Sequence, residues 1–218
     1  MIGLWVILAL VVLLLIAFIA SYNRFVRQRN LVQESWRQID VELRRRHDLI
    51  PNLVETVRGY ATQERTVLQA VTEARASAVQ TMQATASGVA AQAQVETQLG
   101  RALGNLFAVA ENYPDLKSSQ NFLALQQQLA ETEDRIAAGR RFYNNNVRAL
   151  NTRVEAFPSS IVASMFSFTK ADYFEVEDPA VRAPVDVDFS SLNAPAAQPA
   201  QPAAQPAAQP PQTGQQPG

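Results

Sequence analysis

The sequence predicts an all-α protein, in which a bundle of long helices continues from an N-terminal transmembrane helix. Three observations support this fold class. Residues 4–20 are all apolar, and no charged side chain occurs before Arg24. Beyond Arg24, apolar residues recur at steps of three and four, which is the spacing of one face of a helix. The chain has only eight glycines in 218 residues, and few lie beside other turn residues, which argues against a β-rich fold.

The apolar N-terminal segment is long enough to cross a bilayer. A hydrocarbon core of about 30 Å needs about 20 helical residues, and residues 3–22 meet that need. A cleaved signal peptide would carry a basic start and small residues at positions −3 and −1. With Ala20 at −1, position −3 would be Phe18, which is too large. We therefore expect residues 1–23 to be a retained transmembrane anchor rather than a removed signal.

The charges beside the anchor predict its orientation. Arg24, Arg27 and Arg29 follow the apolar run directly, and the N-terminal side offers only the α-amino group. The positive-inside rule then places the N-terminus outside and the bundle in the cytoplasm, on a single-pass membrane protein. These arginines also face the anionic headgroups of the bilayer. The reverse orientation, with the bundle outside the cytoplasm, is the alternative.

The first bundle helix is expected to be a direct continuation of the anchor, because no helix breaker separates them. Pro51 interrupts the pattern, but apolar spacing resumes immediately, which favours a kink over a new helix. Helical spacing then continues past Gly59 as far as Met82. The apolar positions are Phe25, Val32, Trp36, Ile39, Leu43, Ile50, Leu53, Val54, Val57, Tyr60, Ala61, Val67, Leu68, Val71, Ala74, Ala78 and Met82.

Two further helices follow a turn near Gly88. One stripe runs through Val95, Leu99, Leu103, Leu106 and Ala110 and ends at Tyr113, because the residue before a proline is pushed out of helical geometry. Residues 114–119 form a connection, with Ser118 or Ser119 as the N-cap of the next helix. That helix carries a seven-residue repeat of Phe122, Leu129, Ile136, Tyr143, Leu150 and Phe157.

The second row of this repeat predicts how the longest helix packs. Thr132 and Gly139 are small and would let a neighbouring helix approach closely. After Gly139 the row shifts by one residue, to Val147 and Val154, which favours a globular bundle over a long two-stranded coiled coil. Pro158 ends the helix, and a short extra turn then carries Val162, Met165 and Phe166. Phe168, Tyr173 and Phe174 are expected to lay an extended segment back on the bundle.

The C-terminal residues have a different composition from the rest of the chain. Residues 178–218 begin with acidic side chains, and residues 194–218 consist almost entirely of Ala, Pro and Gln with a four-residue repeat. Such a segment cannot bury a core and should remain disordered with polyproline II character. The predicted domains are therefore an anchor (1–23), a helical bundle (24–177) and a disordered tail (178–218).

Two blocks of residues resemble the LemA family. The first runs from Tyr22 through Trp36 and the stretch 45–54 to residues 59–61. The second begins at Glu111, Asn112, Tyr113, Pro114, Asp115, Leu116 and Lys117 and continues through Phe122, Leu129, Arg140, Arg141, Tyr143, Asn144 and Asn151 to residues 174–175. The resemblance covers residues 1 to about 177 and leaves out the tail. The resemblance implies an antiparallel four-helix bundle on an N-terminal anchor in a bacterial plasma (inner) membrane, with the N-terminus outside and the bundle in the cytoplasm. It supplies no catalytic residues.

Composition excludes several kinds of chemistry. A formal net charge of −1 argues against nucleic-acid binding, which usually needs a basic face. The absence of cysteine removes disulfides, thiol nucleophiles and cysteine-ligated metals. His47 is the only histidine, so Glu131, Glu133 and Asp134 lack the Glu-x-x-His partners of a di-iron bundle. We expect no catalytic residue, metal or cofactor, and a hydrolase is the least supported alternative.

Three polar stretches are candidate sites, each with a structural alternative. Glu111 and Tyr113 lie at the connection before the longest helix, where we expect a helix–helix turn, with a partner-docking loop as the alternative. Three consecutive asparagines follow Tyr143. Tyr143, Asn144 and Asn146 are the candidate polar or partner-binding residues of this stretch. Asparagine is a mediocre helix former, so these amides are expected to hydrogen-bond across helices, with a polar binding groove as the alternative. The basic stretch at residues 44–48 is a candidate site for an anion or a lipid headgroup. We expect its side chains instead on solvated faces, with ion pairs to Asp40, Glu42 and Asp48, and His47 at the edge of the core.

The leading functional hypothesis is a non-enzymatic one. We expect a membrane-tethered bundle that presents an interaction surface and a tail at the cytoplasmic face. Its partners would be the lipid bilayer and either an unknown protein or a second copy of the chain. A lipid-organising or membrane-shaping protein that assembles with itself is the alternative.

Overall fold

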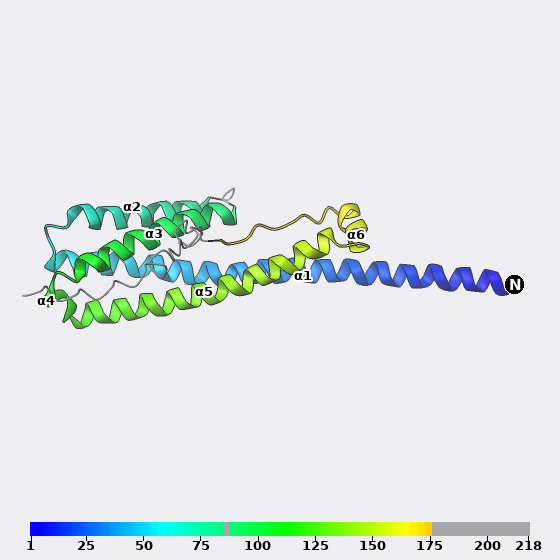
Figure 1. Cartoon of the computed structure of the whole chain (residues 1–218), viewed down its shortest axis with the longest axis horizontal. Helices are drawn as coiled ribbons and strands as arrows, with labels where there is room; N and C mark the ends of the chain where they lie inside the picture. Colours follow the sequence, from blue (N-terminus) through cyan, green and yellow to red (C-terminus); the bar gives the residue numbers. More distant parts are fainter. Residues whose placement is uncertain (85–87, 176–218) are drawn as a thin grey trace, which may run out of the picture. The chain divides into compact units, whose positions relative to one another are not determined.

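The computed structural model describes residues 1–84 and 88–175. Within these ranges it contains six helices and no strand, which confirms the all-α class (Figure 1). The helices are α1 (Ile2–Tyr60), α2 (Arg65–Gln83), α3 (Val89–Ala110), α4 (Pro114–Lys117), α5 (Gln120–Glu155) and α6 (Ser159–Met165). The predicted tail, residues 178–218, lies outside the described residues.

Helix α1 contains both the apolar N-terminal segment and the first helix of the folded region. It is 59 residues long, or about 88 Å at the usual helical rise. It is the one helix of the described ranges that is long and apolar enough to cross a membrane, and none of its most apolar window is buried in the protein. Burial begins at Phe25, and α1 continues through Pro51 without ending, as predicted.

The end of α1 corrects the predicted helix that continued past Gly59 to Met82. The helix stops at Tyr60, a short turn follows, and α2 returns along α1. No glycine or proline lies in residues 61–64, so no local breaker predicts this turn. Tertiary contacts hold it instead: Ala61 is buried, and the Tyr113 hydroxyl donates to Glu64 Oε1 at 3.0 Å.

The later helices lie close to their predicted positions. Gly88 is the N-cap of α3, which therefore begins before the expected Val95. A single helical turn, α4, occupies part of the predicted connection. Ser119 is the N-cap residue of α5, but its side chain makes no capping bond, and Ser118 Oγ donates to Asp115 O instead. The short turn after Pro158 is α6.

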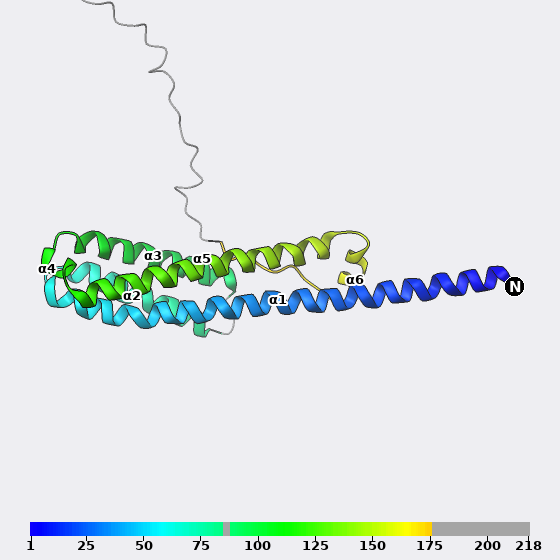
Figure 2. The same ribbon diagram turned by 90° about the horizontal axis from the view of Figure 1, so that it is seen from below.

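Two different arrangements cover the two halves of the α1–α5 pair. These helices run side by side in opposite directions (Figure 2). In the half far from the anchor, the α2–α3 hairpin packs on them, and all four long helices contribute to one core that includes Leu53, Val71, Leu106 and Phe122. In the half near the anchor, α6 and the residues after it take the place of the hairpin (Figure 1).

Residues 168–175, which we call the strap, lie back along α1 and α5 without helical or strand structure. Phe168 stacks on Phe25 with ring centroids 4.8 Å apart, and Phe174 meets the Trp36 ring edge-on at 5.3 Å. Phe174 is 1% exposed. The prediction that aromatic residues lay an extended segment on the bundle is confirmed.

The seven-residue repeat of α5 is buried except at its last position. Phe157 is 82% exposed, because the helix has already ended at Glu155. The small residues behave as predicted: Thr132 is fully buried, and a Cβ on Gly139 would lie 3.0 Å from Ile39 Cγ1 of α1. Gly139 therefore sits where α1 and α5 approach each other most tightly among the glycines of the described helices.

Candidate functional site

Two asparagines of α5, the predicted candidate Asn144 and also Asn151, hold the strap in place. The side chain of Asn144 accepts from the backbone N–H of Phe174 at 2.9 Å and donates to its carbonyl at 3.2 Å. Asn151 makes the same pair of bonds to Ala171, both at 2.9 Å. Seven helical residues and three extended residues both span about 10 Å, so the two amides match the strap in register.

Tyr143 adds a third contact from α5 to the strap. Its hydroxyl donates to the carbonyl of Asp172 at 2.8 Å. Burial, and secondarily the negative charge of Asp172, raises the pKa of Tyr143 to about 12. Asn146 behaves differently from Asn144: its backbone carbonyl accepts from Gln28 Nε2 at 3.0 Å, and its own Nδ2 is buried without a hydrogen-bond partner.

The candidates at the connection before α5 contact one another and the neighbouring turn. The Lys117 ammonium pairs with the Glu111 carboxylate. The bond from the Tyr113 hydroxyl to Glu64 ties this connection to the turn between α1 and α2, and this bond raises the pKa of Tyr113. These contacts are those of a well-specified helix–helix connection at the end of the bundle farthest from the anchor.

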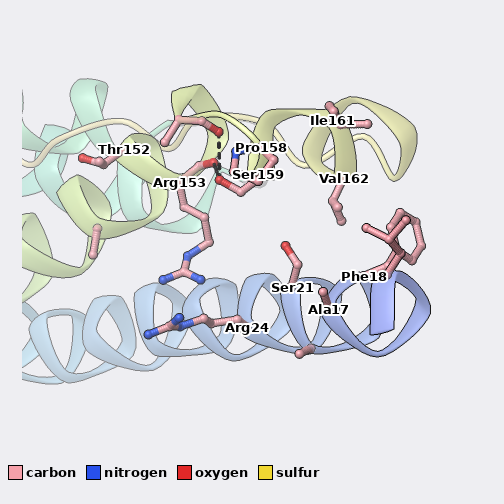
Figure 3. Close-up of a pocket in the computed structure, with 14 residues that line it drawn as sticks. Ala17, Phe18, Ser21, Arg24, Thr152, Arg153, Pro158, Ser159, Ile161 and Val162 are labelled. Carbon is pink, nitrogen blue, oxygen red and sulfur yellow. Dashed lines mark hydrogen bonds between the residues drawn. The ribbon is translucent and has the colours of Figure 1, made fainter. Parts of the chain in front are cut away.

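The three arginines that follow the apolar segment have different surroundings. The Arg29 guanidinium lies over the Phe168 ring at 5.6 Å, and Arg27 is exposed. Arg24 lines a groove between α1 and the α5–α6 junction, where its guanidinium lies near that of Arg153 (Figure 3). Arg24 and Arg27 are three residues apart on α1 and are neighbours on its surface, whereas Arg29 lies beside the strap.

The groove beside Arg24 is mainly apolar. It has a volume of about 730 Å³ and is lined by Leu14, Ala17, Phe18, Ala20, Ser21, Arg24, Ala149, Thr152, Arg153, Ala156, Pro158, Ser159, Ile161 and Val162. The lining from α1 therefore belongs to the final turns of the apolar N-terminal segment. Sequence reasoning missed this groove, because it requires α6 to fold back beside α1.

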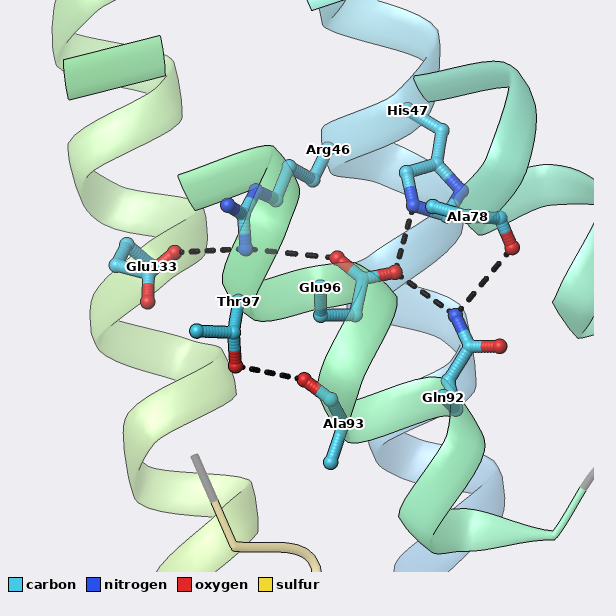
Figure 4. Close-up of polar contacts among 8 residues, drawn as sticks. All are labelled: Arg46, His47, Ala78, Gln92, Ala93, Glu96, Thr97 and Glu133. Carbon is cyan, nitrogen blue, oxygen red and sulfur yellow. Dashed lines mark hydrogen bonds and ion pairs between the residues drawn. The ribbon is translucent and has the colours of Figure 1, made fainter. Parts of the chain in front are cut away.

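A buried polar cluster lies where α1, α2 and α3 meet (Figure 4). Glu96 Oε1 is 2.8 Å from His47 Nε2 and accepts from Gln92 Nε2 at 2.8 Å, while Oε2 lies 3.6 Å from Arg46 Nη1. A carboxylate only accepts, so the histidine donates from Nε2. Arg46 also pairs with Glu133 of α5 at 3.2 Å.

This cluster corrects the expectation of a solvated face for Arg46, whereas His47, expected at the edge of the core, is buried. Arg44 does pair with Asp40 at the surface, at 2.9 Å. Arg46 and His47, however, are 6% and 2% exposed. The partner that makes their burial tolerable, Glu96, comes from another helix, so the short-range pattern of α1 gives no sign of it.

One family matches most of the folded region. A profile of the LemA family matches residues 35–189. The chain belongs to the LemA family. Curated relatives include magnetosome protein MamQ 2 of Paramagnetospirillum magneticum, 28% identical over 80% of this chain and 73% of the relative. MamQ of Magnetospirillum gryphiswaldense is 27% identical over 82% and 74%, and protein LemA of Metamycoplasma hominis is 26% identical over 80% and 77%.

The polar cluster of this LemA-family chain does not have the geometry of a nucleophilic site. His47 Nε2 bonds to Glu96, and within the described residues it has no Ser or Thr hydroxyl as a partner. A surface hollow of about 440 Å³ reaches His47 between α1 and α2, lined also by Arg44, Asp48, Arg75 and Met82. The Glu96 carboxylate instead joins α3 to α1, and Arg46 extends the cluster to Glu133 of α5, so that these contacts fix the register of the helices.

The sequence of this LemA-family chain does contain a signal for the missed glutamate. The buried face of α3 contains Leu106, Leu103 and Leu99. Toward the N-terminus, the same spacing of three and four residues continues to Glu96 and Gln92. The predicted stripe used Val95 instead, which is only partly buried. Residues at helical spacing lie on the same face of a helix, so Gln92 and Glu96 are expected to be buried together with the leucines. Two polar residues in such a position indicate a buried polar cluster.

Proposed function

We propose that this protein is a membrane-anchored, non-enzymatic member of the LemA family that presents an interaction surface at the cytoplasmic face of the membrane. The observation that carries the proposal is the continuity of α1, which is one helix from the apolar segment to the far end of the bundle. A continuous helix transmits the orientation of the anchor to the folded region without a flexible linker. Residues 23–60 would hold the far end about 55 Å from the bilayer.

The exposed apolar side chains of the bundle support an interaction role. Leu123 and Phe142 of α5 are each 49% exposed, and Val41 of α1 is 63% exposed. Scattered apolar residues are common on protein surfaces, so they nominate positions to test rather than a defined patch. The disordered tail predicted from the sequence would be a second recruiting element.

Site-specific photo-crosslinking in cells tests the proposal. A photoreactive residue replaces Leu123 or Phe142, and the exposed Glu131 on the same helix is the matched control. Each is introduced into the full-length chain and into a chain that ends at Leu192. Mass spectrometry should recover one protein repeatedly from an apolar position and not from the control. Dependence on the tail would show which part recruits it, whereas self-crosslinks alone in both chains would refute the scaffold role.

The cytoplasmic orientation has its own test. Because the chain has no cysteine, a single cysteine at the exposed Arg45 gives a clean label site. A membrane-impermeant maleimide should react with Arg45→Cys only after the cells are permeabilised. Labelling of intact cells would place the bundle outside and overturn this part of the proposal.

A second candidate function is supported by the α5–α6 junction. No charged residue occurs between Glu155 and Lys170, and this uncharged segment packs beside the anchor. A self-assembling, lipid-organising protein would use such a surface. Purified full-length protein that forms oligomers and changes liposome shape without a protein partner would favour this candidate.

A further inference from the structure

The uncharged junction lies level with the final turns of the apolar segment of α1. The Phe166 ring is 5.8 Å from that of Phe18 and 4.7 Å from that of Tyr22. If residues 3–22 fill the hydrocarbon core, Phe18 lies inside it, within about 6 Å of the boundary at Tyr22. The α6 helix is therefore positioned at the bilayer interface or within one leaflet.

The exposed side chains of the junction suit such an environment. Phe157, Ile161, Met165 and Phe166 are 82%, 51%, 62% and 45% exposed, and they fall within ten residues of sequence. Apolar surface of this density is unfavourable in water and favourable against acyl chains. Ile161 also lines the groove, together with the last turns of the apolar segment of α1. If that segment spans the membrane, the groove is open to lipid.

The arginines of the groove lack counter-ions. Figure 3 shows the Arg153 side chain directed toward α1, where its guanidinium lies near that of Arg24. Neither forms an ion pair with a carboxylate of the described residues, and Arg153 Nε is buried without a hydrogen-bond partner. Desolvation and, secondarily, the charge of Arg24 lower the pKa of Arg153. Arg153 also lies over the Phe25 ring at 5.9 Å, and Arg24 is exposed. Two neighbouring guanidiniums without a carboxylate partner form a favourable site for an anion.

A phospholipid matches both the two arginines and the apolar lining of the groove. Its phosphate presents oxygens that guanidinium groups bind with strong, directed hydrogen bonds. Its acyl chain matches the apolar lining, and the volume of the groove lies in the range of small-ligand sites, about 300–1,000 Å³. The charged and apolar parts of the groove also lie in the same order as those of a lipid. Arg24 follows the apolar segment, on the headgroup side, and Leu14 and Ala17 lie within that segment, on the acyl-chain side.

We propose that the groove binds one phospholipid of the cytoplasmic leaflet, with its phosphate between Arg24 and Arg153 and an acyl chain along Ala17, Phe18 and Ile161. This inference rests on the membrane anchoring proposed above. The bound lipid would join α1 to the α5–α6 junction and seat the base of the bundle in the membrane.

Photo-labelling in vesicles tests the lipid site. Full-length protein is reconstituted in phosphatidylcholine vesicles that contain phosphatidylglycerol with a photoreactive acyl chain, and labelled peptides are mapped. The label should concentrate on residues 14–21 and 156–162. Arg153→Gln should reduce that labelling about tenfold, because a charge-assisted contact is lost. Arg148→Gln, which removes the same charge from an exposed site of the same helix, should not.

A second pair of variants blocks the groove without altering charge. Ala17→Phe fills the lining and should reduce labelling of residues 156–162, whereas Ala9→Phe, elsewhere on the same apolar segment, should leave it unchanged. Even labelling along the whole anchor, insensitive to Arg153→Gln and Ala17→Phe, would overturn the site. Flotation with the vesicles is read in the same samples: protein that floats but shows no site-specific label refutes the lipid site alone, and protein that does not float refutes the anchoring.

Discussion

The contact between α1 and α5 at Gly139 yields a prediction in which two effects of one substitution oppose each other. Replacing a glycine in a helix interior by alanine normally stabilises by about 1 kcal/mol, because glycine has more conformational freedom to lose. At Gly139 the added Cβ would lie 3.0 Å from Ile39 Cγ1. Carbon atoms prefer about 3.5–4.0 Å, so one of the two helices must move.

The structure indicates that the steric cost of the new Cβ at Gly139 exceeds the gain in helix propensity. Ile39 is 1% exposed and β-branched, so its side chain has little freedom to turn away. Overpacking a well-filled core costs about 1–3 kcal/mol, which exceeds the helix gain. We expect Gly139→Ala to lower the free energy of unfolding by about 1 kcal/mol. Gly104→Ala, with nothing within 4 Å of the new Cβ, should raise it by about 1 kcal/mol.

Urea unfolding of the full-length protein in micelles, followed by circular dichroism, measures both variants. The double variant Ile39→Ala with Gly139→Ala completes the test, because removing Cγ1 vacates the space that the new Cβ needs. Its loss of stability should be about 1 kcal/mol smaller than the sum of the two single losses. Equal stabilisation by Gly139→Ala and Gly104→Ala would refute the close approach of α1 and α5 at this position.

Three further predictions concern the polar contacts. Glu96→Leu should lower the free energy of unfolding by about 3 kcal/mol, because Arg46 stays buried and keeps only the largely exposed Glu133 as a partner. Glu133→Leu, which removes that exposed carboxylate, should cost less than about 1 kcal/mol. Equal urea midpoints for the two variants would contradict this prediction. Asn151→Ala should speed amide exchange in the strap about tenfold and leave the α2–α3 hairpin unchanged, and uniform acceleration would show a global effect instead. Because the pKa of Tyr143 is raised from 10.0 to about 12 in the fold, its contribution to stability is complete below pH 10 and is lost as the pH rises through 12. Unfolding titrations of Tyr143→Phe should lack that alkaline loss, and an unchanged pH profile would refute it.

Much of the fold follows from local sequence. The apolar N-terminal segment, the stripes of α1, α3 and α5, the turn near Gly88 and the short helix after Pro158 all have signals within one or two helical turns. The breakers Pro114 and Pro158 act on neighbouring backbone, and the small residues Thr132 and Gly139 mark the close packing of α5. These features depend on spacing, which a single sequence displays directly.

The candidate sites depended more on partners from distant segments. The asparagines after Tyr143 were noticed because amides are unusual in a strong helix, but only the fold pairs Asn144 and Asn151 with backbone groups of the strap. The polar character of residues 44–48 was also visible. Their burial was not, since it depends on Glu96 of α3.

By itself, the sequence determined that this protein has an apolar segment long enough to cross a membrane, a helical folded region and LemA-family character, because composition and periodicity are local properties. The tertiary structure alone decided where α1 reverses, which polar side chains are buried, and that α6 returns beside the anchor to form a groove with two neighbouring arginines. Those features arise between residues far apart in the chain, and their energies depend on burial and on charge partners that no local pattern records.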